Sequence, residues 1–228
     1  MSAPPGPPPA APHAASPAAV SPVRLEGALE PSLSRWLWLV KWLLVLPHVL
    51  VLALLWVAFA VTSLVAFFAI LITARYPRAL FDFGVGVLRW SWRVSFYSYG
   101  ALGTDRYPPF TLSDDPKYPA RFDVAYPERL SRGLVLVKSW LLVLPHAALV
   151  TLFATGTLHG GGVVGLLVFF AGVSLLFTGG YPPGIFPLVL GLQRWVMRVA
   201  AYTALMTDVY PPFRLDQGGS EPVTVPGV

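Results

Sequence analysis

Two histidines in apolar sequence are the first candidates for chemistry. His48 and His146 each follow a proline, in the tripeptide LPH. Imidazole titrates near neutral pH and binds metals, so a pair of membrane histidines can relay protons or hold a metal ion. We favour the simpler interpretation, in which each ring satisfies a local backbone group or packs between helices. A metal site would also need carboxylates at similar depth, and the surrounding apolar runs contain none.

Two lysines begin the phrases that contain these histidines, KWLLVLPH from Lys41 and KSWLLVLPH from Lys138. Each is expected about two turns into an apolar helix, where a long side chain can reach the lipid headgroups. Tryptophans at the same level are typical of an aromatic belt, and here they are Trp36, Trp38, Trp42 and Trp140. We therefore predict that both lysines anchor helices at the membrane surface. A Schiff-base or general-base role has no partner residue in view.

Four arginines form the third candidate site, and they are Arg89, Arg93, Arg194 and Arg198. Each pair is spaced by four residues and so shares a helix face. On helices that lie in the membrane interface, these side chains would face lipid phosphates while the aromatic residues enter the acyl region. Together with the two lysines they are our candidate headgroup site. The simpler alternative is generic attraction of a protein of net charge +5 to anionic lipid.

The chain contains no recognisable enzyme motif. It has no cysteine, which excludes disulfides, thiol nucleophiles and thiolate metal sites. It also contains no P-loop, no dinucleotide-binding glycine motif after a strand, no HExxH and no GxSxG. We therefore expect no enzymatic activity, no cofactor and no metal. Membrane topology explains the basic residues, so we expect no nucleic-acid partner.

The segments that carry these residues are apolar enough for a membrane. Hydrophobic residues make up 55% of the 228 residues, charged residues make up 12%, and the mean hydropathy is +0.64. Residues 42–74 and 139–193 contain no Lys, Arg, Asp or Glu. One helical pass needs about 20 apolar residues, so the two runs together predict several passes. The composition indicates an integral membrane protein.

Four blocks of sequence recur in the same order about 100 residues later. The pairs are LSRWLWLVKWLLVLPH with LSRGLVLVKSWLLVLPH (33–48 and 130–146), ILITARYPRALF with LLFTGGYPPGIF (70–81 and 175–186), GVLRWSWRVSFY with GLQRWVMRVAAY (86–97 and 191–202), and TDRYPPFTL with TDVYPPFRL (104–112 and 207–215). The chain is therefore a tandem duplication. We divide it into a disordered Pro/Ala-rich tail (1–22), a first membrane repeat (23–112), a cytoplasmic linker (113–129), a second membrane repeat (130–215) and a disordered tail (216–228).

Each repeat predicts two apolar helices followed by a third helix rich in Trp, Arg and Tyr. In the second repeat the glycines of HGGG separate passes at about 133–158 and 163–178. The first repeat should turn near residues 60–63, although a single long helix or a re-entrant segment is an alternative there. The predicted fold class is an all-α integral membrane protein of two tandem repeats.

The predicted turns place every charged residue on one side of the membrane or at its edge. The positive-inside rule makes that side cytoplasmic, with both termini in the cytoplasm and four spans in a bacterial inner membrane. We place the third helix of each repeat in the interface, because a central arginine costs about 2.5–3.5 kcal/mol. If both third helices crossed instead, the protein would have six spans.

Short segments outside the helices alternate apolar with polar residues, as strands do. They are VRLE (23–26), FTL (110–112), ARFDV (120–124) and FRLD (213–216), and they predict a small cytoplasmic sheet. Asp105 and Asp208, in the two TD/YPPF segments, are predicted to be cap or turn residues.

Several of these motifs resemble one known family. YPERLSR, KSWLLVLPH, RYPRALFDFGVGVLRWSWRV and TDRYPPF are closely similar to the bacterial family described as domain of unknown function 4389, from about Leu29 to Leu215. The resemblance implies a multi-pass bacterial membrane protein and supplies no activity, ligand or catalytic residue. The second copy departs from the pattern, because Gly180, Pro183 and Pro187 stand where the first copy has Arg75, Arg78 and Asp82.

The leading hypothesis is a non-enzymatic membrane protein that acts as a scaffold, an accessory subunit or a lipid-interacting element. Its expected partners are the lipid bilayer and anionic phospholipids, and its sequence identifies no protein partner. The alternative is a small transporter or channel that uses one membrane histidine per repeat. A membrane enzyme that acts on lipids is a third hypothesis.

Overall fold

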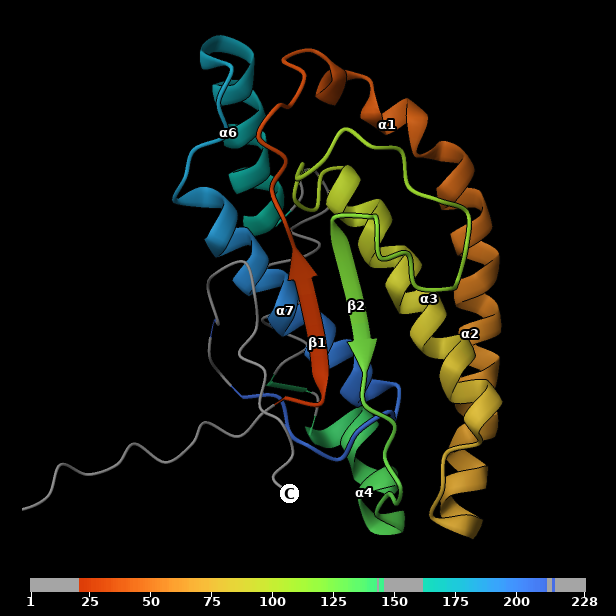
Figure 1. Cartoon of the computed structure of the whole chain (residues 1–228). Helices are drawn as coiled ribbons and strands as arrows, with labels where there is room; N and C mark the ends of the chain where they lie inside the picture. The colour runs from red at the N-terminus through yellow and green to blue at the C-terminus, as the bar shows by residue number, and fades with distance from the viewer. Residues whose placement is uncertain (1–20, 143, 146–161, 213–214, 216–228) are drawn as a thin grey trace, which may run out of the picture.

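The computed structural model describes residues 21–142, 144–145, 162–212 and 215 (Figure 1). In chain order the elements are β1 (Val23–Gly27), the 3-10 helix η1 (Leu37–Leu39), α1 (Lys41–Leu44), α2 (Leu46–Thr73), α3 (Arg78–Tyr97), β2 (Ala120–Val124), α4 (Arg132–Val137), the π-helix η2 (Lys138–Leu142), α6 (Val163–Thr178) and α7 (Ile185–Thr203). The described part of the chain is mostly helical, and the predicted small sheet is present.

The two strands pair antiparallel with Leu25 opposite Phe122 at the centre of the pairing. Leu25 and Phe122 are also equivalent positions of the two repeats, at the same offset as Leu33 and Leu130. The pairing is therefore symmetric, and a local two-fold axis passes through the middle of the sheet. Both strands were predicted from their alternation, and their positions are confirmed.

One face of this sheet is buried and the other carries charge. Val23, Leu25, Phe122 and Val124 are all 4% exposed or less, and side chains between them, such as Asp123, are exposed. The buried face packs on two helices, with β1 against α7 and β2 against α3. Figure 1 shows α7 behind the strands and α3 beside β2. Strand β1 belongs to the first repeat but packs on α7, a helix of the second, so the two repeats share one core.

Helix α2 runs without a break through the position where we predicted a turn. It contains no glycine, and its only proline, Pro47, lies in the first turn, where proline is tolerated. It ends at Ala74, which adopts the left-handed conformation with φ 57°. The predicted turn near residues 60–63 is therefore wrong, since nothing in the sequence there interrupts a helix. We had predicted that all charged residues lie on one side of the membrane. That prediction required the turn, and it therefore loses its basis.

Helices α3 and α7 are central elements, and not the interfacial helices that we predicted. Helix α3 packs between α2 and β2, and α7 contacts β1, α6 and η2. Each buries twelve residues, including Trp92 and Arg93 in α3 and Arg194 and Arg198 in α7. The prediction failed because the polar residues on these helices find partners inside the protein.

The apolar helices of the second repeat lie where we predicted them, as far as they are described. Helix α6 has the predicted bounds and begins directly after Gly162. The predicted pass before it begins as α4 and η2, and its remainder falls mostly on residues 146–161, outside the described residues. Residues 110–112 form no strand, and of residues 213–216 only Leu215 is described.

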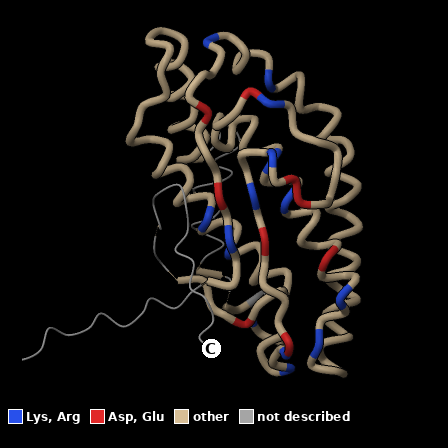
Figure 2. Tube along the Cα trace, in the orientation of Figure 1, with Lys and Arg blue, Asp and Glu red and all other residues tan. Residues whose placement is uncertain are grey.

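Within the described residues, α2 is the one helix long and apolar enough to cross a membrane. Only 17% of its most apolar window is buried inside the protein. Figure 2 shows α2 as uncharged along its length, while Lys, Arg, Asp and Glu lie on the strands, the connecting segments and other helices. Multi-pass topology and the side on which the termini lie stay predictions.

Candidate functional site

Lys41 is held inside the first repeat by groups from the segment that follows α3. Its Nζ donates to the carbonyl oxygen of Thr104 at 2.7 Å and lies 2.9 Å from Oδ1 of Asp105. It also lies 4.5 Å from the ring centre of Tyr97. The other carboxylate oxygen of Asp105 accepts a hydrogen bond from the backbone N–H of Ser34. Asp105 therefore joins the start of the repeat to its end.

The second repeat builds the same contact from equivalent residues. The Nζ of Lys138 donates to the carbonyl oxygen of Thr207 at 3.0 Å and to Oδ1 of Asp208 at 2.7 Å. Oδ2 of Asp208 accepts from the backbone N–H of Ser131 at 2.6 Å. The ring of Tyr202 lies 5.5 Å from the ammonium group. We call the two arrangements the Lys–Asp contacts.

The Lys–Asp contacts change the interpretation of both lysines. We predicted side chains that reach lipid headgroups, but Lys41 is 1% exposed and Lys138 is 0% exposed. Burial lowers the pKa of each lysine from its ordinary value, and the hydrogen bond to the neighbouring aspartate opposes that shift. The two aspartates were predicted to be cap or turn residues, and each also pairs with a buried ammonium group. These groups stabilise the repeat, and the predicted orientation toward lipid is not observed.

Arg89 and Arg194 hold the two strands in the same symmetric way. Nε of Arg89 donates to the carbonyl oxygen of Phe122 at 2.9 Å, and Nε of Arg194 donates to that of Leu25, also at 2.9 Å. The two carbonyl groups belong to the central pair of the sheet. The equivalent arginines of the two repeats therefore bind equivalent strand residues across the local two-fold axis.

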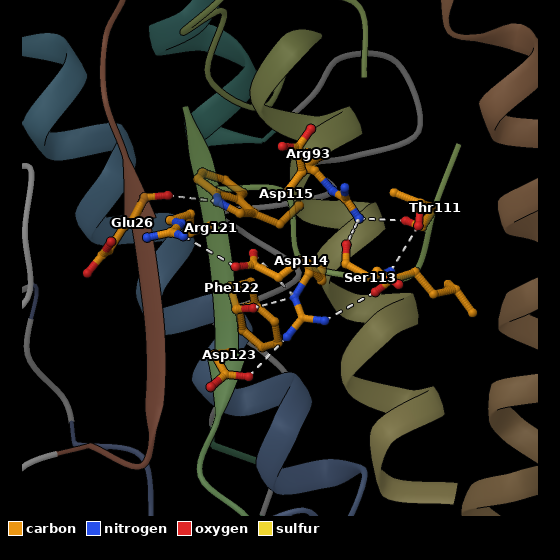
Figure 3. A network of polar contacts seen from close by, with 12 residues as sticks. Glu26, Arg93, Thr111, Ser113, Asp114, Asp115, Arg121, Phe122 and Asp123 are labelled. Carbon is orange, nitrogen blue, oxygen red and sulfur yellow. Dashed lines mark hydrogen bonds and ion pairs between the residues drawn. The ribbon is translucent and has the colours of Figure 1, made fainter. Parts of the chain in front are cut away.

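The remaining candidate arginines are also buried. Nη2 of Arg93 donates to the carbonyl oxygens of Thr111 and Ser113, at 2.5 and 3.1 Å (Figure 3). The exposed fractions are 1% for Arg93, 1% for Arg194 and 4% for Arg198. The four-residue spacing correctly placed each pair on one helix face, but that face points into the protein. The predicted orientation toward lipid phosphates is not observed, and lipid binding by these residues stays untested.

A hollow of about 310 Å³ lies on the charged face of the sheet, and we call it the sheet hollow. Its lining comprises Arg24, Glu26, Arg89, Asp114, Arg121, Phe122 and Asp123. Nη2 of Arg89 pairs with Asp123 at 3.0 Å, and Arg121 pairs with Asp114 at 3.3 Å (Figure 3). The lining has three arginines and three carboxylates, so its formal charges balance. The lining offers no Ser, Cys, Lys or His, and two of its three carboxylates, Asp114 and Asp123, are held in ion pairs.

His48 lies in a box of aromatic rings formed by α2, α3 and the YPPF turn. It is fully buried, stacks on Phe110 at a centroid distance of 3.9 Å, and lies 4.8 Å from the ring of Tyr107. Nε1 of Trp90 donates to its Nδ1 at 3.1 Å. Because Nδ1 accepts, the neutral ring carries its proton on Nε2. These contacts pack the histidine between elements, as in the interpretation that we favoured.

The second histidine, His146, lies outside the described residues. The predicted pairing of His48 with His146 therefore stays a prediction. Within the described segments, no group of three or more His, Cys, Asp or Glu residues is arranged to hold a metal ion.

Sequence reasoning missed a second hollow, at the end of α2, which we call the arginine hollow. Its basic residues are Arg75, Arg129 and Arg132. Arg75 is distant in sequence from Arg129 and Arg132, so no local spacing joins all three. One signal was present, because Arg75 has a glycine as its counterpart in the second repeat.

Comparisons with known proteins agree with the duplication. A family model described as a domain of unknown function (DUF4389) matches residues 35–111 and again residues 136–214. No curated protein matches the chain. No solved structure matches it either. The two matches cover more than half of the sequence and coincide with the two repeats. The chain therefore belongs to the family of domain of unknown function DUF4389 and contains that domain twice in tandem.

Proposed function

We propose that this chain is an integral membrane protein with a non-enzymatic role as a lipid-interacting scaffold. The observation that carries the proposal is the surface of α2. Only a narrow stripe of this helix is buried, formed by His48, Leu52, Phe59, Ala66 and Ile70. Apolar side chains occupy most of the remaining circumference and are exposed. A helix that is apolar all round fits lipid or a protein core. Within the described residues, α2 buries only this stripe and packs a few flanking side chains, such as Leu55 and Phe67, against the protein.

The dimensions of α2 support a membrane span. Its 28 residues extend over about 42 Å at 1.5 Å per residue, and a bilayer core is about 30 Å thick. Val57, Val61, Leu64 and Phe68 follow one another along its exposed side and are each more than half exposed. A contiguous exposed apolar surface of this kind is unusual on a soluble monomer and typical of an interaction surface.

Helix α6 contributes a second exposed apolar surface. Leu166, Phe169, Phe170 and Phe177 are each 53% exposed or more. Its 16 residues extend over about 24 Å, which is shorter than a bilayer core. We propose that α6 contacts lipid beside the span rather than crossing the membrane alone.

The scaffold role rests on how the buried polar groups are used. The contacts of Lys41, Lys138, Arg89 and Arg194 described above go to backbone carbonyls and carboxylates of the protein itself. Such contacts fix one arrangement of the repeats. A transporter would need a path to His48, and His48 lines neither the sheet hollow nor the arginine hollow. No observation favours the channel alternative over the scaffold.

Membrane extraction of two variants tests the proposal. The full chain should stay in the membrane pellet after alkaline carbonate treatment. Replacing both Val57 and Val61 by arginine puts two charges at the middle of α2, and each costs about 2.5–3.5 kcal/mol there. We expect this variant to lose most of its membrane-inserted fraction. The control is Val209→Arg, at a site 50% exposed outside α2, which should insert normally.

A soluble protein would give the opposite result. In water, two arginines on an exposed apolar face improve solubility and leave the fold intact. Release of the unmodified chain by carbonate, together with higher soluble yield of the double variant, would contradict the proposal.

A further inference from the structure

The arginine hollow opens at the carboxyl end of α2 and has a volume of about 680 Å³. Its lining comprises Thr73, Ala74, Arg75, Arg129, Leu130 and Arg132. The backbone N–H of Leu130 donates to the carbonyl oxygen of Ala74 at 2.9 Å, which ties the segment before α4 to the end of α2. That hydrogen bond brings basic residues from two distant parts of the sequence to one place. Figure 2 shows basic positions both at this end of α2 and beside α4.

The charge of this hollow is uncompensated. Its lining has three arginines and no carboxylate, whereas the sheet hollow has three arginines and three carboxylates. Among the described residues, Arg75, Arg129 and Arg132 have no ion pair and no side-chain hydrogen bond. Glu128 adjoins Arg129 in the sequence but does not line the hollow. Three guanidinium groups around one space repel each other, and an anion placed there relieves the repulsion.

The fold does not require this accumulation of charge. At the equivalent end of α6, Gly180 replaces Arg75 and Ser32 replaces Arg129. Only Arg35 remains, as the counterpart of Arg132. A Cβ built on Gly179 would lie 2.6 Å from Nη2 of Arg35, so that guanidinium covers the end of α6. One arginine therefore suffices at the end of α6, and the two additional arginines occur only at the end of α2.

We propose that the arginine hollow binds the phosphate group of an anionic lipid headgroup. This inference rests on the proposed membrane span, because a span that ends at Thr73 brings the hollow to the level of the lipid headgroups. Guanidinium groups form paired hydrogen bonds with phosphate oxygens, and their charge stays fixed at any physiological pH. The hollow is open, and it adjoins the apolar surface of α2, against which the acyl chains of the same lipid would lie.

Lipid retention by the full chain tests the site. The protein is extracted in detergent and placed in bilayer discs that contain phosphatidylglycerol and phosphatidylcholine, and the lipid that remains after re-extraction is measured by mass spectrometry. The test variant carries Arg75→Gln, Arg129→Gln and Arg132→Gln. The control variant carries Arg24→Gln, Arg106→Gln and Arg121→Gln, which removes the same charge from exposed positions outside the hollow.

We expect the test variant to retain at least about tenfold less phosphatidylglycerol per protein, since each charge-assisted hydrogen bond to phosphate is worth a factor of ten or more. The control variant should retain as much as the unmodified chain. The single change Arg75→Gln affects one exposed side chain, and it should lower retention even if the triple variant folds poorly. Equal loss of phosphatidylglycerol in the test and control variants would show that retention depends only on net charge. That result would overturn the proposal.

A second arm separates the lipid from a soluble phosphate. Inorganic phosphate is titrated against the lipid-free protein in a neutral detergent, with the same variants. If phosphate binds in the hollow while phosphatidylglycerol is not retained, the ligand is soluble and the lipid assignment is overturned. Failure of the lipid-site proposal can be told apart from failure of the membrane proposal. If only the lipid site is wrong, these arginine variants still remain in the carbonate-resistant pellet.

Discussion

The two repeats share their buried contacts and differ at the ends of their apolar helices. Both have a Lys–Asp contact, and both have an arginine that binds the central carbonyl of a strand. By contrast, α2 ends at Ala74 next to three arginines, whereas α6 ends at Gly179 next to one. The duplicated contacts are those the fold needs. The features present once are therefore the better candidates for function.

The largest expected effect tests whether the two Lys–Asp contacts are equivalent. Asp105→Asn and Asp208→Asn each leave a buried ammonium group without its carboxylate, and we expect each to lower the free energy of unfolding by about 3 kcal/mol. This figure is the lower limit for buried pairs, because the two aspartates are 22% and 27% exposed. Denaturant unfolding in detergent, followed by tryptophan fluorescence, measures the change.

The control for this pair is Asp82→Asn. Asp82 pairs with Arg78 on the surface, with both side chains more than half exposed. Its loss should change stability by no more than about 0.5 kcal/mol. A neutral result at either Asp105 or Asp208 would show that the repeats do not depend on the same contact.

A smaller effect is expected for the arginines that hold the strands. Arg89→Met and Arg194→Met each remove a charged donor from a strand carbonyl, which we expect to lower stability by about 2 kcal/mol. Amide hydrogen exchange at β1 and β2 should show faster exchange in both variants. Arg24→Met, on the exposed face of β1, should leave exchange unchanged. Protection that survives in both variants would mean that strand pairing alone holds the sheet.

The smallest effect comes from the residues that end the two apolar helices. Ala74 and Gly179 both adopt positive φ, 57° and 74°, a conformation that glycine adopts most easily. Ala74→Gly should therefore stabilise the protein by about 0.5 kcal/mol, and Gly179→Ala should destabilise it by about 1 kcal/mol. Ala53→Gly, in the interior of α2, should instead destabilise by about 1 kcal/mol. Thermal unfolding measures whether each variant raises or lowers the unfolding temperature. A lower unfolding temperature for Ala74→Gly would contradict the inference that α2 and α6 end in the same way.

Features that depend on short stretches of sequence were predicted well. The duplication follows from four matched blocks. Strands β1 and β2 follow from alternation over four and five residues, and the start of α6 follows from the glycines before Val163. In each case the physical cause lies within a few residues of the feature.

Features that depend on distant contacts were missed. Arg194 donates to a carbonyl group 169 residues away, and Arg89 to one 33 residues away. A four-residue spacing of arginines is the same on a helix in the lipid interface and on a helix that faces a sheet, so the pattern cannot choose between them. The turn in α2 was carried over from HGGG by analogy, and the first repeat has no breaker to form it. The arginine hollow needed the contact between Leu130 and Ala74, which no local pattern reveals.

The symmetric strand pairing has a consequence for synthesis of the chain. Strand β1 leaves the ribosome first, but β2 follows about 100 residues later, and α7 later still. During that interval β1 has no partner strand, and its apolar face is not covered by a helix. Unpaired strands of this kind pair with any complementary strand nearby. Two chains growing on one messenger can exchange their β1 strands, because each chain offers the same β2. A domain-swapped dimer with native contacts is therefore the expected by-product whenever synthesis of the second repeat is slow.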